Sequence, residues 1–294
     1  MSRHAFAVQG DGMRLDQAIP AGVTSISRRR ARDLIERGSV SVDGVRTRTC
    51  GRIVKAGASV VVEDGELPAV HGDVDELYRD DDIIVVDKPA GLATEPTRQA
   101  SLSVADTLRK RGLVTAAVNR LDVDTSGVLV LARGPEGAAA WGQVFADGSV
   151  ERLYIGLVRG VIEDNEGVID AWLVPPDRSG RSAVVPSTDR FGKRAITHWQ
   201  VIGRGDGATL VALRPQTGRT HQLRVHLAYI GHPLVGDHRY GPPTTAPHLG
   251  LHARALRAEV RGRPHYFLAP MPPVVVAMCA DAGLAQAVAE APTR

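Results

Sequence analysis

Apolar and polar positions follow two different periods along this 294-residue chain. Continuous apolar runs and two-residue alternation predict strands. Three- and four-residue spacing of apolar positions predicts helices. The predicted strands cover 40–42, 59–62, 83–86, 128–132, 151–160, 167–173, 195–202 and 208–213. The predicted helices cover 13–19, a stretch capped by Ser27 and ended by Gly38, 103–111, 136–146, and a segment that follows Thr220 and ends before Gly231.

The order of these elements predicts the fold class. In the second half of the chain, several strands follow one another without regular helices between them, which is typical of a mainly antiparallel or mixed sheet. We therefore expect an α+β protein with a mixed, mainly antiparallel sheet in its large domain. A smaller α/β domain precedes it.

A break in periodicity predicts the domain boundary. Residues 64–76 contain Gly65, Pro68, Gly72 and several acids without any period, which indicates a linker. We expect a small domain and linker over 1–70 and a large domain over 71–294.

Charge is small in total and uneven along the chain. Lys and Arg number 36 and Asp and Glu 33. Residues 1–64 carry 11 basic residues against 7 acidic ones, so the basic excess is N-terminal. Five arginines lie on the predicted second helix, which is either a solvated face or a surface that binds phosphates. They are Arg28, Arg29, Arg30, Arg32 and Arg37.

Cysteine use and hydropathy predict the compartment. Cys50 and Cys279 have no paired or metal-ligand spacing, which favours free thiols in a reducing compartment. No N-terminal signal is visible, and the apolar stretch 274–280 is far shorter than the roughly 20 residues that span a bilayer. We expect a cytoplasmic monomer that does not associate with membranes.

The candidate chemistry lies in an acidic turn that leads into the buried strand 128–132. Arg120, Asp122, Asp124, Thr125 and Ser126 fall within seven positions, and Gly127 follows. A charged loop on a buried strand is a common place for catalysis. The other interpretation is a turn whose Asp124 and Ser126 bond only to local amides.

The order Arg-Leu-Asp-x-x-Thr-Ser-Gly followed by apolar residues and Ala-Arg resembles the signature of the RluA-type pseudouridine synthases. The resemblance implies that Asp122 is the catalytic residue and that Arg120 enters the RNA near the flipped target base. This chain has Asn119 where the family commonly has His.

Further motifs extend this resemblance over residues 77 to about 273. The strand Arg152-Leu-Tyr-Ile-Gly-Leu-Val-Arg-Gly matches one whose tyrosine, here Tyr154, lies against the uracil; the pattern alone leaves Tyr154 as a packed core residue. Thr217 to Leu227 matches a motif whose second arginine, Arg224, pairs with the catalytic aspartate. Lys88-Pro-Ala-Gly, Gly236-Asp-x-x-Tyr-Gly and Leu251-His-Ala also match, whereas Glu95-Pro96 stands where the family often has His-Pro.

The N-terminal module resembles the small S-four-like RNA-binding domain. The resemblance rests on an early Arg-Leu-Asp, on Ser-Arg-Arg-x-Ala-x-x-Leu-Ile and on Gly-x-Val-x-Val-Asp-Gly. It implies RNA backbone contacts from Arg28, Arg29, Arg30 and Arg32. A second basic segment is either a solvated loop or a further RNA contact; it contains Arg178, Arg181, Arg190, Lys193 and Arg194.

We expect neither a metal nor a cofactor. His221 and His226 are five residues apart, which suits co-ligation from one helix poorly, and no carboxylate completes a set. Pseudouridine formation needs cleavage of the N1–ribose bond, rotation of the uracil and reattachment through C5. Asp122 either attacks the anomeric carbon or removes the neighbouring ribose proton, and the sequence leaves both routes open. Arg224 would stabilise its ionised form.

The function expected from the resemblance is isomerisation of specific uridines in structured RNA. Ribosomal RNA is the expected substrate, with transfer RNA as the alternative. A second hypothesis is an inactive RNA-binding or ribosome-assembly protein. A third is a glycoside or nucleoside hydrolase with Asp122 and Asp124 as paired carboxylates, although residues two apart at a turn rarely straddle one bond.

Overall fold

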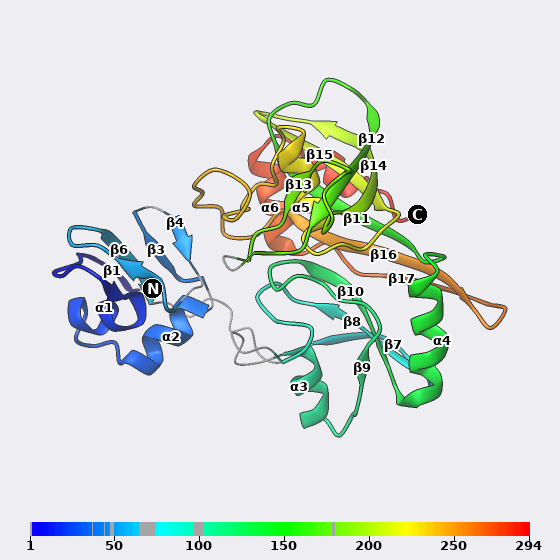
Figure 1. The fold of residues 1–294 in the computed structure, drawn as a ribbon, viewed down its shortest axis with the longest axis horizontal. Coiled ribbons are helices and arrows are strands. Elements are labelled where there is room, and N and C mark those ends of the chain that lie inside the picture. The colour runs from blue at the N-terminus through cyan, green and yellow to red at the C-terminus, as the bar shows by residue number, and fades with distance from the viewer. Residues whose placement is uncertain are drawn as a thin grey trace. The chain divides into compact units, whose positions relative to one another are not determined.

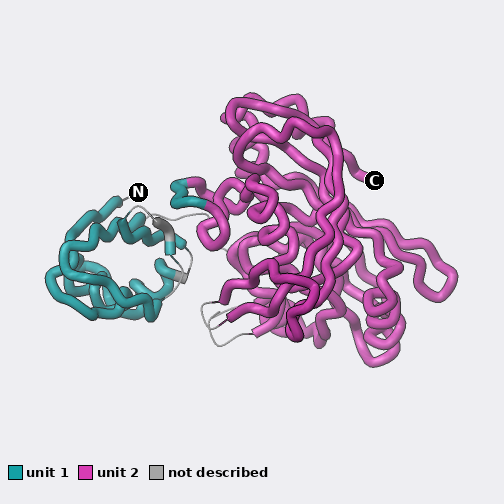
Figure 2. The backbone as a smooth tube through the Cα atoms, turned by 45° about the horizontal axis from the view of Figure 1, so that its top comes forward, with its two compact units in different colours: residues 1–71, 242–245 teal, residues 72–241, 246–294 magenta. Residues whose placement is uncertain are grey.

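The computed structural model describes residues 2–36, 38–43, 45–47, 50–64, 74–96, 103–177 and 180–294. The chain divides into two compact units, residues 1–71 with 242–245 and residues 72–241 with 246–294 (Figure 2). Most of the predicted linker, like Arg37 and Arg178, lies outside the described residues.

In the first unit, two helices pack on small sheets. In its described residues, strands β1 (Ser2–Ala7), β6 (Ser59–Asp64), β3 (Val40–Val42) and β4 (Val45–Thr47) form one sheet in that order, and β2 (Met13–Arg14) pairs with β5 (Ile53–Val54). Helix α1 spans Leu15–Gly22 and α2 spans Arg28–Glu36. The Ser27 hydroxyl accepts a hydrogen bond from the Arg30 amide, as the predicted cap requires. The first helix begins later than predicted because Met13 and Arg14 pair with β5.

The second unit is built on one large sheet (Figure 1). Among the described residues its order is β13-β12-β14-β15-β11-β16-β10-β8-β7, with β9 on β10 and β17 on β16. These strands are β7 (Asp75–Arg79), β8 (Ile83–Lys88), β9 (Ala116–Ala117), β10 (Ser126–Ala132), β11 (Glu151–Arg159), β12 (Glu166–Val174), β13 (Ala183–Val185), β14 (Lys193–Arg204), β15 (Ala208–Pro215), β16 (Leu251–Val260) and β17 (Arg263–Leu268). The β10–β16 pair is parallel and the other pairs are antiparallel, so the predicted α+β class with a mixed, mainly antiparallel sheet is confirmed.

Helices cover both faces of this sheet. They are α3 (Val104–Lys110), α4 (Gly134–Ala146), α5 (Gln222–Tyr229), α6 (Pro273–Asp281) and α7 (Ala285–Ala289). Alternate residues of β11 and β15 belong to different cores: Ile155 packs with α6 and α7, whereas Val211 packs with α5. Trp141 of α4 is buried against β10 and β16. The site-bearing loops therefore rest on a sheet that is packed from both sides.

The C-terminal elements β16, β17, α6 and α7 are absent from the predicted set. Strand β16 carries His and Arg among its apolar residues, which hides its period, yet most of its side chains are buried between its neighbours. Within the described part of the chain, no helix is long and apolar enough to cross a membrane.

Candidate active site

Asp122 lies on a loop whose main chain is fixed on both sides of it. The Thr94 hydroxyl donates to the Leu121 carbonyl at 3.1 Å and accepts from the Leu121 amide at 3.2 Å. On the other side, the Val123 carbonyl accepts from the Gly91 amide at 2.7 Å and from Lys88 Nζ at 3.1 Å. The carboxylate is thus held through its two neighbours in sequence.

Lys88 links the Lys-Pro-Ala-Gly turn to this loop. Its side chain is fully buried, and Nζ also donates to the carbonyls of Pro89 at 2.9 Å and Leu92 at 2.7 Å. A buried ammonium is tolerated only when its donors are satisfied, and here three carbonyl dipoles face it. The lysine therefore ties the turn after β8 to the backbone beside Asp122.

The start of β10 can approach β16 closely because residue 127 is a glycine. Its φ is +114°, and a Cβ there would lie 2.1 Å from the Ala253 carbonyl oxygen. Only glycine fits this approach. One residue earlier, buried Ser126 Oγ lies 2.9 Å from His252 Nδ1. Asn119, where the family commonly has His, accepts the Val130 amide with its side-chain oxygen at 3.0 Å and so supports the same strand.

Arg224 lies between two carboxylates. Its Nε and Nη2 donate to Asp237 at 2.8 and 2.7 Å, a bidentate pair, while Nη1 lies 3.6 Å from Asp122 Oδ2. The side chains of Arg224 and Asp237 are 3% and 0% exposed, and that of Asp122 is 24% exposed. The family resemblance implies that Arg224 pairs with Asp122. The tighter contact is with Asp237, for which the sequence analysis predicted no role.

The two buried charges stabilise each other. Burial by itself would lower the pKa of Arg224, but the hydrogen bonds and charge of Asp237, with Asp122 and Asp124, raise it above its ordinary value. Burial would raise the pKa of Asp237, and the contacts from Arg224 with the Tyr240 and Arg239 amides bring it below its ordinary value. Asp122 therefore faces a guanidinium that stays charged.

Two further residues, for which the sequence predicted no role in catalysis, contact the residues of this site. His221 Nε2 lies 4.0 Å from Asp122 Oδ1, and His221 Nδ1 lies 2.7 Å from the Tyr240 hydroxyl. The Arg224 guanidinium lies 5.3 Å from the centre of the Tyr240 ring. Tyr240 belongs to the Gly236-Asp-x-x-Tyr-Gly motif, which was the available signal.

Tyr154 is close to Asp122 through the strand register. In β11 it pairs with Ala253 of β16, and Ala253 also pairs with Gly127 of β10. Its side chain is partly buried, on the face opposite Leu153 and Ile155, as the alternation predicts. Burial raises the pKa of its phenol, the charge of Asp122 raises it further and that of Arg152 lowers it. Tyr154 is therefore a neutral aromatic residue near the carboxylate.

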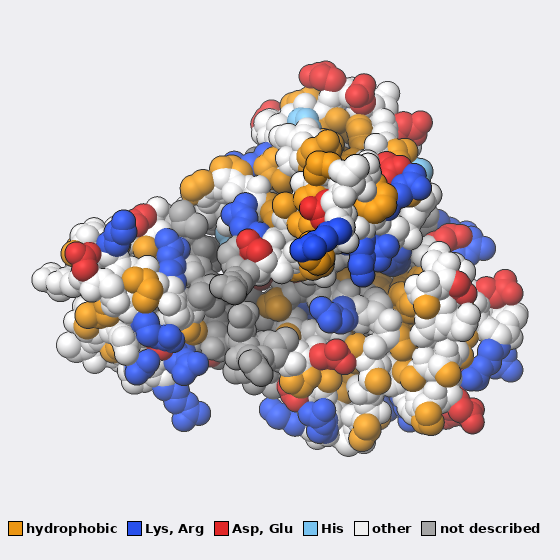
Figure 3. Space-filling model, in the orientation of Figure 1, with side chains coloured by type: hydrophobic (Ala, Val, Ile, Leu, Met, Phe, Trp, Pro, Cys, Tyr) orange, Lys and Arg blue, Asp and Glu red, His pale blue; other side chains and the backbone are white. Residues whose placement is uncertain are grey.

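The predicted RNA-binding arginines are in two different settings. Arg120 is exposed two residues before Asp122. On α2, Arg28, Arg29 and Arg32 are all exposed. Arg28 also donates to Asp16 at 3.2 Å, and Arg30 donates to Asp33 at 2.9 Å. Basic side chains gather over α2 on the face of the first unit shown in Figure 3.

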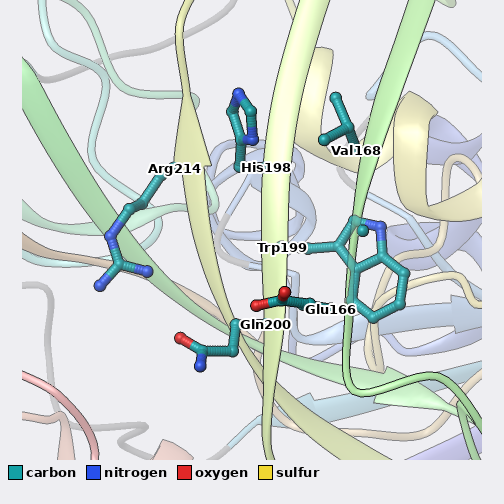
Figure 4. A pocket seen from close by; sticks show the side chains of 7 residues that line it. Glu166, Val168, His198, Trp199, Gln200 and Arg214 are labelled. Carbon is teal, nitrogen blue, oxygen red and sulfur yellow. The ribbon is translucent and has the colours of Figure 1, made fainter.

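A hollow of about 250 Å³ lies elsewhere on the sheet, on strands β12, β14 and β15 (Figure 4). It is lined by Glu166, Gly167, Val168, His198, Trp199, Gln200 and Arg214. None of the residues around Asp122 is among them, so it is not the predicted catalytic site. In the described residues, no three or more His, Cys, Asp or Glu side chains are grouped to hold a metal.

Solved structures share this architecture. The human RNA pseudouridylate synthase domain containing 1 protein matches 79% of this chain and 99% of its own with a TM-score of 0.61 and 27% identity. The human domain containing 4 protein gives a TM-score of 0.60 and 26% identity over 70% of this chain and 92% of its own. The fold is therefore that of a pseudouridine synthase.

Sequence relatives identify the family. Residues 82–229 match the family model for RNA pseudouridylate synthases. An uncharacterised RNA pseudouridine synthase of Zymomonas mobilis is 41% identical over 67% of this chain and 93% of its own length. A ribosomal large subunit pseudouridine synthase D of Nitrosomonas europaea is 37% identical over 82% of this chain and 76% of its own. The chain belongs to the RluA-type pseudouridine synthase family and is an isomerase.

Proposed function

We propose that this enzyme isomerises specific uridines of ribosomal RNA and that Asp122 is its catalytic carboxylate. The choice of RNA is supported by relatives that are named ribosomal large subunit pseudouridine synthases. The choice of residue is carried by one observation: Asp122 is partly exposed to solvent, while Lys88 and Arg224, which lie around it, are buried.

The surrounding residues take separate roles in this proposal. The charge of Arg224 keeps Asp122 ionised for either route, attack on the anomeric carbon or removal of the adjacent ribose proton. The target uridine must leave its stack to reach the carboxylate. Exposed Arg120 fills the space that the base vacates, and Tyr154 stacks on the uracil.

In the same proposal, the first unit is an S-four-like RNA-binding domain. Its exposed arginines on α2 contact backbone phosphates, which contribute affinity without sequence information. Arg29 and Arg32 are the preferred candidates for these contacts, because Arg28 and Arg30 already have carboxylate partners.

The catalytic assignment is tested by Asp122→Asn, which removes a charge and little volume. Tritium release from RNA labelled at uridine C5 should be abolished, while RNA affinity and thermal unfolding should stay near those of the unsubstituted protein. The matched control is Asp124→Asn, the same change two residues away on the same loop, which should retain activity. Turnover by Asp122→Asn would refute the assignment, and loss only in Asp124→Asn would transfer it to Asp124.

The substrate is tested separately in cells. Pseudouridines are mapped in ribosomal and transfer RNA with and without the gene, and with the gene encoding Asp122→Asn. We expect loss of one or a few sites in ribosomal RNA in both mutant strains. Loss confined to transfer RNA would contradict the proposed substrate and leave the chemistry intact.

A further inference from the structure

His221 has an unusual backbone at the start of α5. Its φ and ψ are +56° and 18°, the left-handed region, and it occupies the N-cap position without a side-chain capping bond. Residues other than glycine adopt this region at some cost, and such positions concentrate at functional sites. Its imidazole, 15% exposed, points toward Asp122 instead of capping the helix.

The hydrogen bonds of Tyr240 favour one tautomer of the His221 imidazole. The Ser182 amide donates to the Tyr240 oxygen at 2.9 Å, so this oxygen already serves as an acceptor. The phenol proton is then available for donation to His221 Nδ1, which lies 2.7 Å away. With Nδ1 as the acceptor, the ring proton of a neutral imidazole is on Nε2.

Both groups hold the protonation states that this arrangement needs. Burial raises the pKa of Tyr240, although the Ser182 bonds and the charges of Arg224 and Arg239 oppose the shift, so the phenol remains a donor. Burial lowers the pKa of His221; the charges of Asp122 and Asp237 oppose this, and those of Arg224 and Arg239 add to it. The imidazole is therefore neutral near pH 7.

The two oxygens of Asp122 consequently face different donors. Arg224 Nη1 lies 3.6 Å from Oδ2, and the Nε2–H of His221 lies 4.0 Å from Oδ1. We propose that His221 is a positioning residue, whose Nε2–H, directed by Tyr240, holds the Asp122 carboxylate in its reactive orientation when RNA is bound. Both contacts are long in the free protein, as contacts that tighten in the substrate complex often are.

This inference rests on the proposed role of Asp122, and it excludes another role for His221. With its proton on Nε2 and Nδ1 occupied by Tyr240, the imidazole presents no lone pair to the substrate side. It is therefore a donor and not the base that removes a proton from the RNA.

A pair of substitutions separates positioning from a purely structural role. His221→Asn suits the left-handed backbone and keeps a polar atom near the position of Nδ1, but it cannot reach Asp122. His221→Gln fits the backbone less well but places an amide donor near the position of Nε2. Under single-turnover conditions at saturating RNA, we expect the Asn variant to lose roughly 10²-fold in rate and the Gln variant to stay within about tenfold of the unsubstituted enzyme.

RNA affinity should be unchanged in both variants, because the effect is on the reactive orientation and not on binding. Equal rates in the two variants, or a faster Asn variant, would overturn the proposal.

The tautomer has a test that does not depend on activity. Nitrogen-15 NMR of the imidazole should show His221 protonated on Nε2 in the unsubstituted protein. In Tyr240→Phe, the signal should shift toward a mixture of the two tautomers. Protonation on Nδ1 would overturn the inference even if the enzyme is active, and a protein with the expected tautomer that makes no pseudouridine would refute the proposed function instead.

Discussion

Each unit of the molecule contains a fully buried aspartate that binds arginine, and the two pairs are built differently. In the first unit, Asp16 accepts from Arg14 at 3.0 Å and from Arg28 at 3.2 Å, and the arginine side chains are 46% and 53% exposed. In the second unit, Asp237 binds Arg224, which is itself buried. The ion pairs of Asp16 are therefore accessible to solvent, whereas the pair of Asp237 with Arg224 is buried.

The difference shows what each pair contributes. Arg14 and Arg28 cover Asp16 from the surface, so they tie the start of α1 to α2 and leave their outer edges in solvent. Arg224 binds Asp237 through Nε and Nη2, and its remaining nitrogen, Nη1, faces Asp122. Because electrostatic contacts are stronger where water is excluded, the enclosed pair is suited to support Asp122, the proposed catalytic carboxylate.

The largest expected effect is in the enclosed pair. Asp237→Asn leaves Arg224 buried with one partner fewer, and breaking such a pair typically costs about 3–5 kcal/mol. We expect faster hydrogen exchange of the α5 amides and a loss of pseudouridine formation. Asp170→Asn, which breaks an exposed pair with Arg194, is the control and should change neither. Unaltered hydrogen exchange in Asp237→Asn would mean that the pair of Asp237 with Arg224 does not stabilise the second unit.

The next largest expected effect is a difference between the two units in their stability toward acid. Burial lowers the pKa of His226 and His252 in the second unit to about 4. Between about 6.5 and 4, the unfolded chain binds protons there that the native unit does not, so stability falls as the pH drops through this window, by up to about 3 kcal/mol for each histidine. The pKa of Asp16 is lowered against its burial by the two arginines, so its contribution persists until the pH falls below about 4.

Hydrogen exchange at pH 7, 5.5 and 4.5 checks this order. Amides of β16 and α5 should lose protection at a higher pH than amides of α1 and α2. Loss of protection in the first unit at pH 5.5 would contradict the assignment of acid sensitivity to the buried histidines.

A smaller effect is expected from Asp16→Asn. Arg14 and Arg28 are half-exposed and regain water when the carboxylate is removed, so the cost is about 1–3 kcal/mol, mainly from the buried amide. This loss of stability should appear only as faster hydrogen exchange of the α1 and α2 amides. Single-turnover rates at saturating RNA should be unchanged, and a reduced rate would show that the first unit takes part in the chemistry.

The smallest effect concerns the exposed arginines of α2. Substitution of both Arg29 and Arg32 by Ala should flatten the salt dependence of RNA binding, by roughly 0.7 in log-log slope for each phosphate that the protein no longer neutralises. Arg28→Ala is the matched control and should change the slope less, because its guanidinium is already paired with Asp16. An unaltered slope in the double variant would make α2 a solvated face and refute the proposed RNA contact.

Local sequence patterns predicted the helices and strands well, but they predicted the contacts between distant side chains poorly. Ser27 and the apolar spacing after it were sufficient for α2, and alternation placed Tyr154 on the face opposite Ile155. The ion pair of Arg224 with Asp237 and the contact of His221 with Tyr240 were not predicted from the residues. They join positions 13 and 19 residues apart that only the folded loop brings together.

Strand β16 shows the same limit at the level of the fold. It lies between β10 and β11 and so sets the spacing between Asp122 and Tyr154, yet its sequence has no clear period. Its place depends on pairing with strands that lie far earlier in the chain, as in the Tyr154–Ala253 and Ser126–His252 pairs. Periodicity within a single segment contains no information on such pairing.

The anchoring of the Asp122 loop also has a consequence for engineering. Thr94, Gly91 and Lys88 hold this loop through the backbone of residues 121 and 123, so the fold specifies a path for the chain and not the side chain at position 123. Val123 is 36% exposed and adjoins Asp122. A library of substitutions at this single position would vary the surface beside the carboxylate while its supports stay in place. With Asp122 as the proposed catalytic residue, Val123 is a starting point for redirecting the enzyme to other uridines.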